Sequence, residues 1–328
     1  MRVSMVSCSL VTVVMALGAP GSAQAADYWA PDGFFVGQNA VSYAPDDTVR
    51  IQAGIGAMYL RGDEKVVSGN NTISHLIWQT KTPVLRGSIA VDFGGGLSAS
   101  LEGSTAGFGT SYMEDYDWLR GDYAFDNWSD RSQHPDTRLN HYFTGAAALG
   151  YELVNHDNAV VRVHGGFKYT DVKWTAHGGT FVYSGLGFRD TTGSFADGVP
   201  GITYRQQLPE LFLGFDGEED YGSFRVGGLL RGGVTFFSTA TDDHWLRNLR
   251  FVDSLYMAPT FTAGVDIGFD IGRNAEFILA ARYDHIFEQR GDTRYYDIPT
   301  GVQIGGATNA AAGALRSAEL TAALKGSF

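Results

Sequence analysis

Apolar and polar residues alternate along many segments of this chain. The final segment shows the pattern most clearly, with one apolar and one polar series of alternate positions. Successive side chains of a β-strand point to opposite faces, so the pattern predicts amphipathic strands rather than helices. The apolar series is Leu320, Ala322, Leu324 and Phe328, and the polar series is Glu319, Thr321, Lys325 and Ser327.

Ten segments of this kind are expected, and bacterial single-chain membrane barrels have an even number of strands. The last strand ends at Phe328, and a C-terminal aromatic residue is typical of bacterial outer-membrane barrels. We therefore expect an all-β, ten-stranded antiparallel transmembrane barrel, with apolar faces toward lipid and polar faces toward the lumen. A soluble β-sandwich that ends in phenylalanine is the alternative. The expected strands are 48–60, 84–94, 96–110, 139–154, 159–176, 202–216, 222–238, 250–270, 275–290 and 315–328.

Connections of two lengths are expected between these strands. The triplet Gly94, Gly95 and Gly96 indicates a tight periplasmic turn. Stretches rich in Asp, Asn and Gly at 111–138, 184–200, 239–249 and 290–314 indicate longer outer loops.

The N-terminus has the features of a secretory signal peptide. Arg2 supplies its positive charge, an apolar run follows, and Ala23 to Ala25 fits a small-x-small cleavage site. We expect residues 1–25 to be removed, which leaves one barrel domain over 26–328. Because Cys8, the single cysteine of the sequence, falls in the signal, thiol catalysis and cysteine-ligated zinc are excluded for the mature chain.

Composition and charge narrow the class further. The sequence has 43 Gly, 16 Tyr and 21 Phe, which favours a barrel with aromatic girdles at the membrane interfaces. Its formal net charge is −12 at pH 7. Such acidity argues against nucleic-acid binding and suits cationic partners such as Lys/Arg-rich peptides.

Two short phrases carry candidate chemistry. Asp115 and Asp117 are two residues apart, and so are Asp242 and His244. Residues i and i+2 of a strand share a face, so each phrase places two polar groups together. A carboxylate beside an imidazole favours its charged form, and two close carboxylates can position a water. This is hydrolase chemistry if both pairs meet at the outward rim, where the alternation of short and long connections places them.

The phrase around Asp115 and the stretch Trp128 to Thr137, which reads WSDRSQHPDT, resemble the omptins, a family of outer-membrane aspartyl-type endopeptidases. The family signature W-[TS]-D-x-S-x-H-P-x-T is met in this stretch. A further match covers residues 166–195, and Asp242 to His244 gives the family's Asp-x-His. The similarity extends over most of the mature chain in the same order.

The resemblance implies catalytic roles for four residues. Asp242 would orient His244, and His244 would act as general base on a water held by Asp115 and Asp117. No protein nucleophile and no metal is implied. Ser132 and His134 invite a serine-hydrolase alternative, but no Gly-x-Ser-x-Gly surrounds Ser132, and we expect both to support the groove.

The resemblance also implies polypeptide substrates cut between basic residues. Glu64 matches one acid of the family's specificity pocket, whereas the position of the second acid is Ala240. The alternation turns Asp243 away from that pocket. Asp130 is expected to meet a basic residue on the other side of the scissile bond.

Omptins use lipopolysaccharide as a lipid activator, so the resemblance implies outer-membrane lipid as a partner, with no other cofactor. Two positions where the family has basic residues are Asp171 and Gln207 in this chain. We expect a monomer in the bacterial outer membrane with its active site on the extracellular side. The alternatives are a surface adhesin of omptin architecture, for which Ala240 is the main support, and a passive porin or lipid-modifying barrel.

Overall fold

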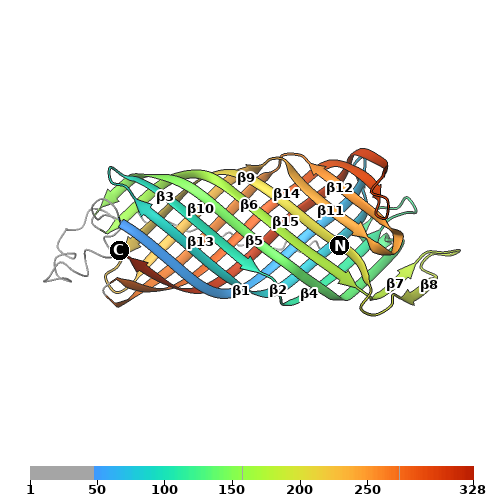
Figure 1. The fold of residues 1–328 in the computed structure, drawn as a ribbon, viewed down its shortest axis with the longest axis horizontal. Coiled ribbons are helices and arrows are strands. Elements are labelled where there is room, and N and C mark those ends of the chain that lie inside the picture. The colour runs from blue at the N-terminus through green and yellow to red at the C-terminus, as the bar shows by residue number, and fades with distance from the viewer. Residues whose placement is uncertain (1–47, 157, 273) are drawn as a thin grey trace, which may run out of the picture.

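The computed structural model describes residues 48–156, 158–272 and 274–328, and the expected signal peptide lies outside these residues. The helices and strands are numbered in their order along the chain, as labelled in Figure 1. None of the helices in the described residues has the length and apolar character needed to cross a membrane. The elements are β1 Thr48–Ser68, β2 Asn71–Asp92, β3 Leu97–Ala106, β4 Thr110–Asp117, η2 Phe125–Asn127, β5 Asp130–His156, β6 Ala159–His177, β7 Thr180–Tyr183, β8 Thr191–Ser194, β9 Pro200–Asp220, β10 Arg225–Thr235, β11 Ser238–His244, η3 Trp245–Arg247, β12 Leu249–Leu255, β13 Pro259–Gly272, β14 Ala275–Asp297 and β15 Gln303–Ser327.

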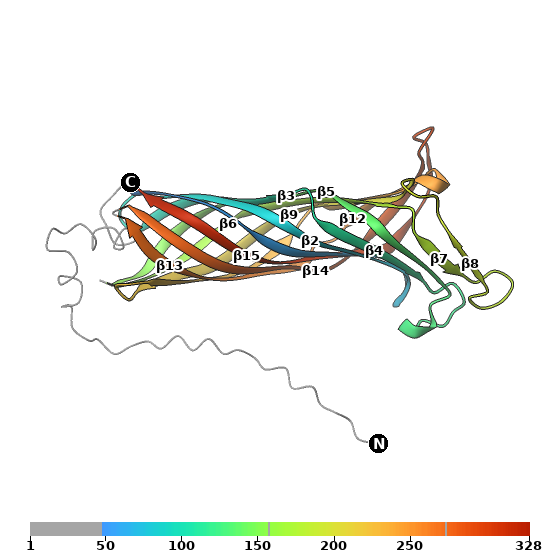
Figure 2. The same cartoon turned by 90° about the horizontal axis from the view of Figure 1, so that it is seen from below.

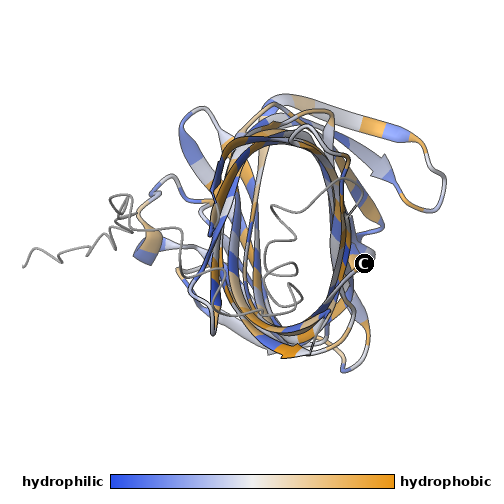
Figure 3. Cartoon of the chain, turned by 90° about the vertical axis from the view of Figure 1, so that its left-hand side faces the viewer, coloured by the Kyte–Doolittle hydropathy of each residue, from blue (hydrophilic) through white to orange (hydrophobic). Residues whose placement is uncertain are grey.

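The antiparallel pairings close on themselves. They run from β1 through β2, β3, β5, β6, β9, β10, β13, β14 and β15 and return to β1. The circuit encloses an oval cross-section (Figure 3). Toward one end, β4 takes the place of β3, and β11 with β12 takes the place of β10 with β13. The sheet therefore has no free edge along this wall.

The wall is apolar outside and polar inside. On β15, Leu320 is 67% exposed and points outward, while its neighbours Glu319 and Thr321 are buried in the interior. This agrees with the alternation expected for that segment. The exposed apolar residues form a band around the outer wall. One edge of this band lies at Tyr59 on β1, Leu85 on β2 and Phe287 on β14.

Beyond this apolar band, several strands continue where long loops were expected. Residues 111–138 contain β4 and the start of β5, residues 239–249 contain β11, and much of 290–314 lies in β14 and β15. The expected strand 250–270 is two strands, β12 and β13. These expectations were wrong because the inner face beyond the band mixes buried apolar residues such as Met113 and Trp78 with acids, so apolar and polar residues no longer alternate with a regular period of two.

Short turns and longer connections separate to opposite ends. Gly94, Gly95 and Gly96 join β2 to β3 with φ values of 76°, 61° and 81°, a left-handed conformation that glycine adopts without strain. The tight turn expected here is confirmed. At the end away from the C-terminus, β7 and β8 form an arm that extends past the barrel (Figures 1 and 2). We call this end the open end.

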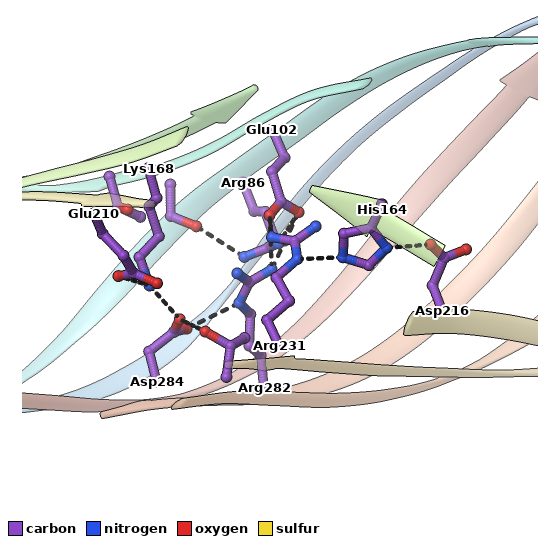
Figure 4. A network of polar contacts seen from close by, with 12 residues as sticks. Arg86, Glu102, His164, Lys168, Glu210, Asp216, Arg231, Arg282 and Asp284 are labelled. Atoms are coloured by element: carbon purple, nitrogen blue, oxygen red, sulfur yellow. Dashed lines mark hydrogen bonds and ion pairs between the residues drawn. The ribbon is translucent and has the colours of Figure 1, made fainter. Parts of the chain in front are cut away.

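An ionic network crosses the interior at the level of the apolar band (Figure 4). Glu102 forms ion pairs with Arg86, Arg231 and Arg282. Arg282 also reaches Asp284 at 2.9 Å. Because Glu102 lies on β3 and its three arginine partners lie on β2, β10 and β14, the network links several sectors of the wall.

Candidate active site

The Asp242–His244 pair lies at the end of β11. Both side chains face the interior, and the imidazole Nε2 lies 2.6 Å from Oδ2 of Asp242. A carboxylate accepts only, so Nε2 carries the hydrogen of this bond and Nδ1 keeps its lone pair. Phe251 of β12 packs edge-on against the imidazole, with ring centroids 5.3 Å apart. Carboxylate and aromatic ring together fix the orientation of His244.

Asp115 and Asp117 project from β4 into the same open end. Ser74 of β2 donates a hydrogen bond to Oδ1 of Asp115 at 3.3 Å. Both residues lie beyond the apolar band. Burial and the neighbouring Asp117 charge raise the pKa of Asp115 well above its usual range. Burial also raises the pKa of Asp117, and the charge of Asp130 adds to this effect.

The two pairs lie within electrostatic reach of each other. The carboxylate of Asp242 raises the pKa of Asp115, and the imidazole of His244 lowers that of Asp117. The open end therefore brings together a general-base candidate and two carboxylates. A water held between them would have the Nδ1 acceptor of His244 on one side and the two carboxyl groups on the other.

The two expected substrate-binding residues lie on either side of this group. Asp130 is the register partner of Asp117 on β5, and its Oδ1 accepts the backbone N–H of Ser184 at 3.1 Å. Glu64 is buried on β1, where Trp78 donates an indole N–H to its Oε2 at 3.3 Å. Burial and the nearby charge of Asp242 raise the pKa of Glu64. Glu64 is therefore adjacent to the Asp242–His244 pair.

Asp243 points away from this interior, as the alternation predicted. It is the register partner of Arg250, and the guanidinium Nη2 of Arg250 donates to its Oδ2 at 3.0 Å. Its carboxylate is therefore committed to the outer face of β11.

Ser132 and His134 form a separate, enclosed pair beside the carboxylates. The Ser132 hydroxyl lies 2.9 Å from Nε2 of His134, whose Nδ1 donates to the carbonyl of Gly178 at 2.6 Å. Phe195 stacks on the imidazole at 5.4 Å. Burial lowers the pKa of His134, which favours the neutral ring. A backbone carbonyl occupies the position that the carboxylate holds in a serine-hydrolase triad.

The tryptophans of the matched phrases brace the loops of the open end. The guanidinium of Arg189 lies 3.6 Å from the ring centroid of Trp128, and its Nε donates to the Trp128 carbonyl. Trp118 donates its indole N–H to the carbonyl of Ala124 at 2.9 Å. Trp245 donates to the hydroxyl of Thr203 at 2.8 Å. These contacts tie the arm and the rim loops to the barrel wall.

Sequence reasoning missed four residues that act on the site. Ser74 bonds Asp115, and the exposed Arg247 of η3 lowers the pKa of both Asp115 and Asp117. Burial and the charge of Asp115 raise the pKa of Tyr183 to about 12. Asp253 lies in the interior beside Asp242 and Glu64. None of them stands in a recognisable motif, because their proximity comes from strand register.

Comparison with known proteins places this geometry in a family. The model of the omptin family matches residues 45–328. The chain belongs to the omptin family. It is 26% identical over 271 residues to Protease 7 of Escherichia coli K12, covering 80% of this chain and 85% of that protein. It is 25% identical over 312 residues to the plasminogen activator of Yersinia pestis, covering 93% and 94%.

A solved structure supports the same assignment. The crystal structure of the outer membrane protease OmpT from Escherichia coli superposes with a TM-score of 0.81 at 25% identity. The match covers 87% of this chain and 97% of that chain. The all-β antiparallel architecture is therefore shared along nearly the whole of the solved relative.

Proposed function

We propose that this protein is an endopeptidase of the bacterial outer membrane with its active site on the extracellular side. The observation that carries the proposal is the Asp242–His244 hydrogen bond of 2.6 Å facing a pair of carboxylates. The membership of the omptin family and the relatives named as proteases support it. The exposed apolar band supports a ten-stranded transmembrane barrel that inserts up to the level of Tyr59 on β1.

In the proposed reaction, water is the nucleophile. Nδ1 of His244 takes a proton from the water as the oxygen attacks the peptide carbonyl carbon. Asp242 stabilises the imidazolium that forms. Asp115 and Asp117 share a proton and hold the water and the developing oxyanion. The imidazolium then returns the proton to the leaving nitrogen. Such an aspartyl-type mechanism needs neither a protein nucleophile nor a cofactor.

The proposed substrates are polypeptides with basic residues at the cleavage site. Glu64 lies next to Asp242, on the side of the barrel expected to bind the residue before the scissile bond. Asp130 lies beside Asp117 and is expected to bind the residue after it. Both are acids in an acidic protein, so cationic peptides are attracted as well as bound.

Lipid contacts are proposed for the outer wall. At the outer face of β6, Nε of Arg205 donates to Asp171 at 2.9 Å, and His141 lies 3.0 Å from the same carboxylate. Lys168 turns inward to Glu210. Asp171 thus neutralises Arg205, and Lys168 is turned away from the lipid-facing surface, so we propose activity with or without lipopolysaccharide, by a monomer.

The test uses the full chain in outer-membrane vesicles and a quenched peptide with an Arg-Arg centre. The wild type should cut the peptide, and His244→Ala should lose about 10²–10⁴-fold in kcat/KM, the usual share of a positioned general base. His156→Ala, at the exposed far end of β5, is the matched control and should keep full activity. Equal activity of wild type and His244→Ala would contradict the proposal.

Ala240 favours a second candidate function. A small apolar residue stands there instead of an acid, as expected for a surface adhesin of omptin architecture with weak or altered proteolysis. That function predicts binding to extracellular proteins that is retained in Asp242→Asn. Loss of cleavage together with undiminished binding in this variant would favour the adhesin.

A further inference from the structure

Three neighbouring strands of the open end each contribute one inward-facing residue to a row across the wall. On β11 this row lies at Ala240, the inward-facing position that precedes Asp242 and His244. Ala240 of β11 is the register partner of Gln206 on β9 and of Asp253 on β12. Partners in an antiparallel ladder project to the same face, so Asp253 and Gln206 flank the methyl group of Ala240. The alanine leaves the middle of the row without a polar group.

Asp253 places a carboxylate in this row, close to two others. It is 7% exposed, compared with 6% for Glu64 and 3% for Asp242. Within the part of the chain that the structure describes, the recorded ion pairs join none of these three carboxylates to a lysine or arginine. Buried carboxylates normally have a cationic partner or a full set of hydrogen bonds, so this group lacks positive charge.

Unpartnered hydrogen-bond acceptors lie beside the carboxylates. Gln206 is fully buried, and its Nε2 donates to the Tyr204 hydroxyl at 2.9 Å, but its Oε1 has no hydrogen-bond partner among the described residues. The same holds for Oδ1 of Asp242. Buried acceptors without donors are rare in native proteins and point to a ligand that supplies N–H groups.

The wall next to the row is aromatic. Trp78 stacks with Tyr204 at 5.9 Å and with Trp174 at 6.0 Å between ring centroids. All three are buried in the interior. Aromatic faces suit the aliphatic stem and the cationic head of a long side chain.

We propose that Asp253, together with Glu64, binds a cationic arginine or lysine side chain of the substrate. Asp253 would supply, from β12, the second carboxylate that β11 lacks at Ala240. The proposal rests on the endopeptidase function proposed above and makes Asp253 a specificity-determining residue. The substrate's N–H donors would satisfy Oε1 of Gln206, and its charge would compensate the two carboxylates.

The test compares two peptides that differ only before the scissile bond, one with arginine and one with its neutral analogue citrulline. The wild type should prefer the arginine peptide in kcat/KM. In Asp253→Asn this preference should fall about 10- to 100-fold, as expected for one member of a buried charge pair. Cleavage of the citrulline peptide should persist, because the Asp242–His244 pair is untouched.

A rescue variant tests the register argument. Ala240→Asp in the Asp253→Asn background should restore most of the preference, since the new carboxylate projects into the same row. Asp292→Asn is the matched control, because this acid lies on the outer face of β14 and bonds the exposed Tyr256. It should leave the preference unchanged. Asp253→Thr provides a second neutral variant if Asp253→Asn does not fold.

The outcomes separate this inference from the proposed function. If the wild type cuts neither peptide, the endopeptidase proposal fails. If the wild type cuts both equally, or if folded Asp253→Asn and Asp253→Thr keep the full preference, the role of Asp253 is refuted while the proteolytic function stands. If Asp253→Asn changes only the preference for the residue after the scissile bond, the assignment is also refuted.

Discussion

Two groups of buried carboxylates occupy the interior of this barrel, and they differ in how their charge is compensated. At the level of the apolar band, Glu102 has three arginine partners, and Asp284 is paired with both Arg282 and Lys168 (Figure 4). His164 is held between Asp216 and Arg231. At the open end, Glu64, Asp242 and Asp253 share a small space with His244 as the recorded ion-pair partner of Asp242.

The difference separates a structural from a functional use of the same residue type. Paired charges in the band join strands that are far apart in sequence, and they have no need of a ligand. Burial and the nearby charge of Asp242 raise the pKa of Glu64 and of Asp253, and such uncompensated carboxylates remain available to a proton, a water or a cation. Perturbed acids of this kind are expected at an active site rather than in a scaffold.

The largest effect should follow from neutralising the carboxylate pair at the open end. The double variant Asp115→Asn/Asp117→Asn should lose about 10²–10⁴-fold in kcat/KM, because neither amide can share a proton with the water or the oxyanion. Initial rates on the Arg-Arg peptide measure the loss. Asp136→Asn, an exposed acid paired with Arg138, is the control. Retention of a tenth of the activity would contradict the proposed role.

Breaking the paired network should affect stability instead. Arg282→Met leaves Glu102 and Asp284 each without one cationic partner, and the free energy of unfolding should fall by about 3–5 kcal/mol. Urea unfolding followed by the gel mobility of the folded barrel measures it. Arg138→Met removes an exposed pair of the outer wall and should cost less than about 1 kcal/mol. Equal losses in both variants would remove the distinction between the two regions.

The preference for arginine at the open end should depend on pH. Burial raises the pKa of Asp253 from 3.8 to about 7. Asp253 is therefore neutral below pH 7 and charged above it, so the preference for arginine over citrulline should rise between about pH 6 and 8. The ratio of kcat/KM values reports this pKa in the free enzyme. A preference that is flat with pH in the wild type, or that still rises in Asp253→Asn, would contradict the assignment.

The same shift predicts a stability effect of opposite sign. A carboxyl whose pKa is raised on folding stabilises the folded state below its unfolded pKa, and this contribution is lost as the pH rises through the folded pKa. The Asp253 contribution is thus present near pH 4 and lost by about pH 8. Unfolding midpoints should fall over this range in the wild type and fall less in Asp253→Asn.

The smallest effect is expected at Ser132. Ser132→Ala removes a neutral hydrogen bond to His134, worth about 0.5–1.5 kcal/mol, and should lower kcat/KM less than about tenfold. Peptide hydrolysis rates check it, with Thr105→Ala, which removes a hydroxyl hydrogen bond to the Tyr142 carbonyl, as the control. A loss above 10³-fold would revive the serine-hydrolase alternative.

The sequence by itself determined the strand pattern within the apolar band and the family. Residues such as Leu320 and Glu319 alternate because lipid-facing and interior positions differ in polarity, and that difference is visible along the chain. The phrases around Asp115, Trp128 and His244 indicated the family because they are contiguous. The length of the strands beyond the band was not predictable, since polarity no longer alternates there.

Only the tertiary structure decided which residues gather around the reacting groups. Asp253 lies thirteen positions from Ala240, and no sequence pattern connects them, yet strand register makes them neighbours. Glu64 comes from the first strand and joins them only because the barrel closes through β15 and β14. The sequence showed an acid missing at 240, and the register showed where another carboxylate lies. Cross-strand proximity depends on closure and register, which are properties of the whole sheet.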